Sequence, residues 1–156
     1  MTISVPAALQ AIATGASATR SLAAWWRRSK GDARALIGEL KENFTYLDLV
    51  ASEGVELAEV IDKLSDAEFR RLSREGFDFN RLKRGKISYY PSLEGTELGR
   101  LSGKSTEALV ESIYDRIADL KIRYPHLKER PNYRWSVRVN NIRKRIWLLL
   151  LHVGND

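Results

Sequence analysis

The strongest constraint on the fold is a periodic apolar pattern near the end of the chain, in residues 132–153. Apolar side chains recur there at alternating steps of four and three residues, the spacing of one continuous stripe along an α-helix. The stripe consists of Trp135, Val139, Ile142, Ile146, Leu149 and Val153. No polar side chain interrupts residues 146–151, so the C-terminal half of this helix should be buried on every side. We predict that it is the central helix of a bundle.

This apolar run does not predict a transmembrane helix. Crossing a bilayer takes about 20 apolar residues, whereas the uninterrupted run covers residues 146–151 and directly follows Arg143, Lys144 and Arg145. No secretory signal is expected, because the residues before the first apolar region lack positive charge and that region contains Arg20. We therefore expect a cytoplasmic protein, with peripheral attachment to a membrane as the alternative.

The remaining periodic segments predict further helices. An amphipathic helix is expected over residues 33–51, ending at Gly54, and a second one over 105–124. An alanine-rich helix is expected over residues 6–28, ahead of these two.

Shorter segments complete the predicted fold. Short helices are expected over residues 55–64 and 65–76, the second opened by a capping box of Ser65 and Glu68. Residues 77–104 are rich in glycine and are predicted to form an irregular basic connection with at most one helical turn. We predict a single all-α domain over residues 1–156: a compact helical bundle of four main helices, two short helices and a long basic loop.

Charge is distributed unevenly along the chain. The net charge of +6 and the pI near 9.7 favour a polyanionic partner. Acidic residues predominate from 32 to 62, and basic residues predominate from 115 to 145. One interpretation is that an acidic helix packs beside the basic one. The other is an exposed basic face for nucleic acid, anionic lipid or an acidic protein.

Two basic clusters are predicted to contact such a partner. The cluster in the connection precedes Tyr89 and Tyr90, and cations beside aromatic faces are typical of single-strand nucleic-acid sites. The simpler interpretation is that the aromatic residues fold the connection onto the bundle. The predicted contacts are Arg81, Lys83, Arg84 and Lys86 in the connection and Arg134, Arg138, Arg143 and Lys144 on the last helix.

From these clusters we predict a small, non-enzymatic binding module. Its partner would be an acidic protein, a nucleic acid or an anionic membrane surface, and self-association into a homo-oligomer stays open. No cofactor is expected. The sequence contains no cysteine, which excludes disulfides and thiolate metal sites, and its 2 histidines would need carboxylates to complete a zinc site. The segment GRLSGKS ends as a P-loop does, but its two glycines lie one residue too close together.

The N-terminal segment supplies a second hypothesis. It ends in Trp25, Trp26, Arg27 and Arg28, a combination that suits the interface between lipid headgroups and acyl chains. Together with the bundle that follows, ISVPAALQAIATGASATRSLAAWW resembles the HeLo-type cell-death domains, in which an apolar first helix is released to attack a membrane. The resemblance implies a membrane-acting effector with a detachable segment 1–28 and these four residues as contacts. The alternative is that small residues let this helix pack within the bundle.

Arg145 and His152 supply the only catalytic hypothesis. They lie about two turns apart on the same side of the last helix. An arginine followed a few residues later by a histidine, on a C-terminal helix, is the motif of the all-α ribonucleases of the HEPN type, and this pair resembles it. The resemblance implies that Arg145 steadies phosphate charge while His152 transfers protons. The chain departs from the family pattern at Ile146, where a polar residue is usual. The simpler interpretation is that His152 interacts with the last carbonyls of its helix.

Overall fold

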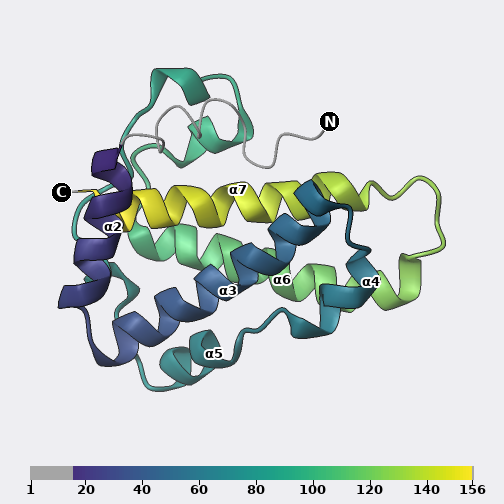
Figure 1. The fold of residues 1–156 in the computed structure, drawn as a ribbon, viewed down its shortest axis with the longest axis horizontal. Coiled ribbons are helices and arrows are strands. Elements are labelled where there is room, and N and C mark those ends of the chain that lie inside the picture. Colours follow the sequence, from purple (N-terminus) through teal and green to yellow (C-terminus); the bar gives the residue numbers. More distant parts are fainter. Residues whose placement is uncertain (1–15, 156) are drawn as a thin grey trace.

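The computed structural model describes residues 16–155, with side chains from Leu22 onward, and all regular structure in this part is helical (Figure 1). The prediction of an all-α bundle with four main and two short helices is therefore confirmed. The boundaries of the predicted domain, 1–156, and the start of the predicted helix 6–28 lie outside the described residues. The α-helices are α2 (Ala16–Arg28), α3 (Gly31–Glu53), α4 (Leu57–Val60), α5 (Ala67–Arg74), α6 (Thr106–Leu127) and α7 (Trp135–Gly154).

Helix α7 is the centre of the bundle, as its sequence predicts. Within the apolar stripe every residue from Val139 to Val153 is buried, and Trp135 at the exposed end is half-buried. Helices α2, α3 and α6 all pack on α7, and Figure 1 shows α2 lying across its C-terminal end. The all-round apolar half of α7 is thus covered by several helices, as such a segment requires.

The contact between α2 and α7 depends on a glycine. A Cβ atom added to Gly154 would lie 2.9 Å from both the Cα and the backbone nitrogen of Leu22. Further along α2, Trp26 packs over α3 and lies between two cations: the Arg34 guanidinium is 4.5 Å and the Lys41 ammonium 4.4 Å from the centre of its ring. Helix α2 is therefore held near its middle by close backbone packing and near its C-terminal end by cation–π contacts.

A buried carboxylate, Glu39, connects α3 to α5 and α6. Its Oε2 accepts hydrogen bonds from Ser65 Oγ at 2.8 Å and from the Glu68 N–H at 2.9 Å. Its Oε1 accepts from the Tyr114 hydroxyl at 2.8 Å and from the Phe69 N–H at 3.3 Å. Burial, together with the Glu39 charge, raises the pKa of Tyr114 well above its ordinary value, so this hydroxyl remains a donor.

The start of α5 differs from the sequence prediction. The expected capping box of Ser65 and Glu68 is wrong, because the Glu68 N–H bonds to Glu39 of another helix. Asn43, one turn further along α3, holds the backbone of Ser65 from both sides: its Nδ2 donates to the carbonyl at 2.7 Å and its Oδ1 accepts from the N–H at 2.9 Å. Helix α3 therefore supplies the caps that were expected from the local sequence. A capping box does form at the start of α4, between Glu56 and Glu59.

Helix α3 ends as expected before Gly54, whose φ is 73°. Two other segments contain more helix than predicted. Helix α6 runs through Pro125 to Leu127, because a proline in the last turn removes only one backbone hydrogen bond. The connection 77–104 contains three short 3₁₀ helices rather than one turn at most. They are η2 (Phe79–Arg81), η3 (Pro91–Leu93) and η4 (Glu97–Leu101), while η1 (Ile61–Lys63) follows α4.

Buried side chains hold the connection against the bundle. Phe79, Ile87, Leu93 and Leu98 are each at most 6% exposed. The Ile87 N–H donates to the Lys104 carbonyl at 2.9 Å, and the Ile87 carbonyl accepts from the Gly103 N–H at 2.9 Å, which closes the connection on itself. As the simpler interpretation of this segment expects, Phe79 and Ile87 pack inward, but Tyr89 is 55% exposed and does not.

Replacing Glu39 with glutamine should destabilise the fold. The amide keeps the size of the side chain but presents an NH₂ group to two of the four donors that the carboxylate accepts. We expect a loss of about 2 kcal/mol in the free energy of unfolding, measured by urea denaturation. Glu42→Gln, on the exposed side of the same helix, is the matched control and should change stability by less than about 0.5 kcal/mol. Equal stabilities for the two variants would contradict the role assigned to Glu39.

Gly154→Ala should displace α2 from α7. The added methyl group would meet the backbone of Leu22, which cannot rotate away as a side chain would. We expect a loss of about 1–3 kcal/mol in the free energy of unfolding, accompanied by a change in tryptophan fluorescence because Trp26 moves with α2. Unchanged stability and fluorescence would show that α2 is not closely packed at this point.

Candidate functional site

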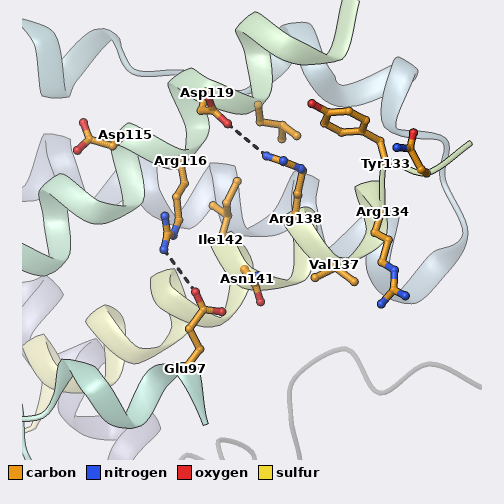
Figure 2. A pocket seen from close by; sticks show the side chains of 12 residues that line it. Glu97, Asp115, Arg116, Asp119, Tyr133, Arg134, Val137, Arg138, Asn141 and Ile142 are labelled. Atoms are coloured by element: carbon orange, nitrogen blue, oxygen red, sulfur yellow. Dashed lines mark hydrogen bonds and ion pairs between the residues drawn. The ribbon is translucent and has the colours of Figure 1, made fainter. Parts of the chain in front are cut away.

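A cavity of about 560 Å³ opens between α6 and α7, and we call it the α6–α7 cleft (Figure 2). Residues at steps of three and four on α6 face a similar row on α7, with the turn before α7 at one end and η4 at the other. The lining residues are Glu97, Asp115, Arg116, Asp119, Leu120, Asn132, Tyr133, Arg134, Val137, Arg138, Asn141 and Ile142. Two of the predicted contact residues, Arg134 and Arg138, lie together in this cleft.

Aromatic rings fix an arginine at the outer end of the cleft. The Arg138 guanidinium lies 5.1 Å from the centre of the Tyr133 ring and 5.9 Å from that of Trp135. Its Nη1 also donates to Asp119 Oδ2 at 3.3 Å, and Asp119 is shared with Arg123 at 2.7 Å. Arg138 is therefore held in one orientation before any partner arrives, which lowers the entropy cost of binding.

Two further side chains at the outer end are free to bind a partner. Arg134 is exposed, forms no ion pair with any other described residue, and points away from the paired side chains in Figure 2. Val137, one turn further along α7, is 44% exposed although it is apolar. An unpaired cation beside an exposed apolar side chain is typical of a contact surface.

A carboxylate joins two arginines at the inner end of the cleft. Glu97 Oε1 accepts from Arg145 Nη2 at 2.7 Å and from Arg116 Nη2 at 3.4 Å. The hydrogen bond from Arg145 lowers the pKa of Glu97, and the charges of Arg116 and Arg100 act in the same direction, so the carboxylate is ionised at neutral pH. Arg145 is 3% exposed, and its burial lowers the pKa of its guanidinium.

The four predicted contacts on α7 have different surroundings. Arg134 and Arg138 lie in the α6–α7 cleft, whereas Lys144 is half-buried and is not among the residues that line it. Arg143 is 0% exposed, and its guanidinium donates to Asp48 Oδ1 at 2.8 Å and to Ser52 Oγ at 3.1 Å. Arg143 is therefore not a surface contact. It follows the other interpretation of the charge pattern, in which acidic α3 packs beside basic α7.

The predicted contacts in the connection lie elsewhere. Lys83 donates to the backbone carbonyl of Asn155, just after α7 ends, so this cluster lies at the opposite end of α7 from Arg134. A helix of this length spans roughly 30 Å, so the two predicted clusters do not form one compact patch. Arg84 pairs with Asp78 at 3.4 Å, and Arg81 lies over Phe77, whereas Lys86 is exposed without an ion pair to the described residues.

His152 is buried in a hydrogen-bond network that makes its Nε2 a donor. Its Nε2 lies 2.8 Å from Thr106 Oγ1, and the same hydroxyl donates to the Lys83 carbonyl at 2.7 Å. The hydroxyl has one proton and donates it to the Lys83 carbonyl, so Nε2 must be the donor to Thr106 Oγ1. Burial, with a contribution from the Lys83 charge, lowers the pKa of His152. The expected interaction with the last carbonyls of its helix is wrong, because the partner belongs to α6.

This arrangement gives the ribonuclease hypothesis no geometric support. His152 is 6% exposed and its Nε2 proton is committed to Thr106, while Arg145 is committed to Glu97. His152 is therefore not available to transfer a proton to a phosphate at the surface, and Arg145 could meet such a phosphate only if Glu97 moved away. Among residues 16–155, no group of His, Asp and Glu side chains is arranged to hold a metal ion.

The predicted membrane contacts are split between core and surface. Trp25 and Trp26 are half-buried and pack against the core, whereas Arg27 and Arg28 are exposed at the end of α2. The two rings could reach a bilayer only after α2 left α3 and α7. No helix in the described part of the chain is long and apolar enough to span a membrane.

Several residues of the cleft were not singled out in the sequence. Glu97, Arg116, Asp119 and Tyr133 come from η4, α6 and the turn before α7, and no local motif connects them. The one available signal was the sequence Tyr133–Arg134–Trp135, which places a cation between two aromatic residues. Comparisons of the chain with protein-family models, characterised proteins and solved structures give no match.

The pKa of His152 predicts how stability depends on pH. In the unfolded chain the ring binds a proton below about pH 6.5, but the folded protein holds it neutral to a lower pH. The free energy of unfolding should therefore fall as the pH drops below 6.5, level off below the folded-state pKa, and carry no contribution from His152 at higher pH. Urea denaturation between pH 5 and pH 7.5 measures this slope.

His152→Gln should flatten that slope, because the amide can still donate to Thr106 but does not titrate. His126→Gln is the matched control, since His126 is exposed on α6. A slope that is the same in wild type and in His152→Gln would show that His152 does not cause it.

Proposed function

We propose that the protein is a non-enzymatic binding module and that its α6–α7 cleft receives an acidic segment of a partner protein. The supporting observation is the outer end of the cleft, where Arg138 is stacked on Tyr133 and Trp135 beside the unpaired Arg134. Tyrosine, tryptophan and arginine are the side chains that dominate binding energy at protein–protein interfaces. Arg138 would orient the segment, and Val137 would contact an apolar side chain between its acidic residues.

The charge around the outer end favours an acidic partner. Arg134 has no carboxylate partner among the described residues, and Lys128 and Arg130 in the preceding turn are also exposed without ion pairs. A net charge of +6 would attract acidic segments over a distance and raise the rate of association. Arg138 already has a carboxylate partner in Asp119. Arg134 has none among the described residues, so it would gain the most favourable electrostatic interaction from a carboxylate of the partner.

The shape and charge of the cleft favour a protein segment over a nucleic acid or a bilayer. Asp115 and Asp119 lie on the α6 wall and repel anions, so they disfavour a continuous run of phosphates more than a protein segment that can place neutral side chains against them. A cavity of about 560 Å³ accommodates a few side chains, whereas a membrane presents a flat surface that does not enter it. The clusters at Arg81–Lys86 and Arg27–Arg28 remain the contacts for the nucleic-acid and membrane alternatives.

Arg134→Glu tests the proposal. We expect it to weaken binding of a short peptide rich in Glu and Asp, with one leucine, by at least about tenfold, because it replaces attraction with repulsion at the outer end of the cleft. Binding is measured by isothermal titration calorimetry at two salt concentrations, and amide chemical shifts locate the peptide. Arg74→Glu makes the same charge change at an exposed position on α5 and should leave the affinity within about twofold.

Other ligands are measured in parallel, and binding of these ligands could contradict the proposed function of the cleft. Single-stranded RNA, duplex DNA and anionic vesicles are titrated against the same proteins, and the RNA is then inspected for cleavage. Tight RNA or DNA binding that is lost in Lys86→Glu but kept in Arg134→Glu would replace the cleft with the connection as the contact surface. Vesicle binding without peptide binding would favour the membrane hypothesis.

A further inference from the structure

The inner end of the α6–α7 cleft contains more hydrogen-bond donors than it uses. Arg116 and Arg145 both donate to the same oxygen of Glu97, at 3.4 Å and 2.7 Å. The Nε atoms of both arginines are buried and have no hydrogen-bond partner in the described part of the chain. A guanidinium normally binds a carboxylate through two parallel hydrogen bonds. Here two guanidinium groups share one carboxylate oxygen. Arg145 Nη1 also donates to the Asn141 carbonyl at 3.1 Å, but the Nε atom of each arginine has no acceptor among the described residues.

Positive charge exceeds negative charge at this point. Arg145 and Arg116 both pair with Glu97, and the charge of Arg100 also contributes to the lowered pKa of this carboxyl, so three arginines act on one carboxylate. The Arg145 side chain is only 4% exposed. A guanidinium buried to this extent is strongly unfavourable without an anion beside it. The inner end therefore needs a carboxylate at all times, but it does not need that carboxylate to be Glu97.

Glu97 is positioned so that it can leave. Its side chain is 44% exposed, and it lies in η4, a 3₁₀ helix of 5 residues in the connection rather than in a long helix. Rotation of the side chain toward solvent would break two ion pairs and would not require the backbone to unfold. A second carboxylate that arrived as Glu97 left would replace those pairs, so the exchange would cost little free energy.

We propose that Arg116 and Arg145 form a carboxylate-binding subsite at the inner end of the cleft, which Glu97 fills in the free protein and an acidic side chain of the partner fills in the complex. This inference rests on the proposed function, because it identifies the group that the cleft recognises. The partner segment would place one carboxylate against Arg134 at the outer end and a second between Arg116 and Arg145. The nearby Asp115 and Asp119 favour a singly charged carboxylate over a doubly charged phosphate.

Glu97→Gln tests the subsite directly. It removes the charge that competes with the ligand, so the Glu- and Asp-rich peptide should bind about tenfold more tightly than to wild type, by calorimetry under the same conditions. Glu111→Gln removes one charge from an exposed position on α6 outside the cleft, and should raise the affinity by no more than about twofold. In Glu97→Gln/Arg116→Gln the gain should disappear, because the subsite loses one of its arginines.

A second variant tests the subsite in case Glu97→Gln is too unstable to measure. Glu97→Asp keeps the charge but is shorter by one methylene group, so it cannot reach both guanidinium groups equally well and should also bind the peptide more tightly. The peptide should raise the melting temperature of both variants more than that of wild type, because it restores the missing anion.

The outcomes separate this inference from the proposed function. If the peptide binds wild type in a manner that depends on Arg134, and neither Glu97 variant strengthens binding, the subsite is wrong and the proposed function stands. If the peptide binds none of the proteins, both are wrong. An equal gain in Glu97→Gln and Glu111→Gln would mean that only the overall charge matters, and would overturn the subsite.

Discussion

The structure depends on one constraint: the C-terminal half of α7 is apolar on all sides and must be covered on all sides. Helices α2, α3 and α6 provide that cover, with α2 in backbone contact at Gly154. The N-terminal half of α7 carries a single apolar stripe, so the same neighbours need not enclose it. The α6–α7 cleft lies where this cover ends, between Asp115 on α6 and Arg134 before α7. The cleft is therefore a consequence of how apolar residues are distributed along one helix.

Each buried charge in the bundle meets a partner from a different element. Glu39 of α3 accepts hydrogen bonds from the start of α5, Arg143 of α7 pairs with Asp48 of α3, and Arg145 of α7 pairs with Glu97 of η4. Apolar packing alone tolerates small shifts between helices, whereas a buried ion pair is satisfied in one register only. We therefore expect these contacts to favour one register of the helices over others. They also explain why a strongly basic helix can be central to the fold.

The fold was largely predictable from sequence, and the site only in part. The periodicity of residues 132–153 predicted a central α7, and Gly54 predicted the end of α3, because both signals depend on residues close together in the chain. The predicted capping box at the start of α5 was wrong because Glu39, which is distant in the sequence, accepts the hydrogen bond that the local cap was expected to accept. Arg134 and Arg138 were predicted as contacts and lie in the cleft. Arg143 was predicted with them, but periodicity does not reveal that it faces Asp48 of α3.

The central position of α7 also affects the order in which the domain can form during translation. Helices α2, α3 and α6 all leave the ribosome before α7. Until α7 emerges, the apolar faces that these helices pack against it have no partner. The long-range contacts of α3 with α7 connect residues such as Asp48 and Arg143, so they form only when most of the domain has been synthesised. The core can therefore be completed only after α7 has emerged, and until then the apolar faces of the earlier helices lack their main partner. Slow synthesis of the segment before α7 would prolong this vulnerable period.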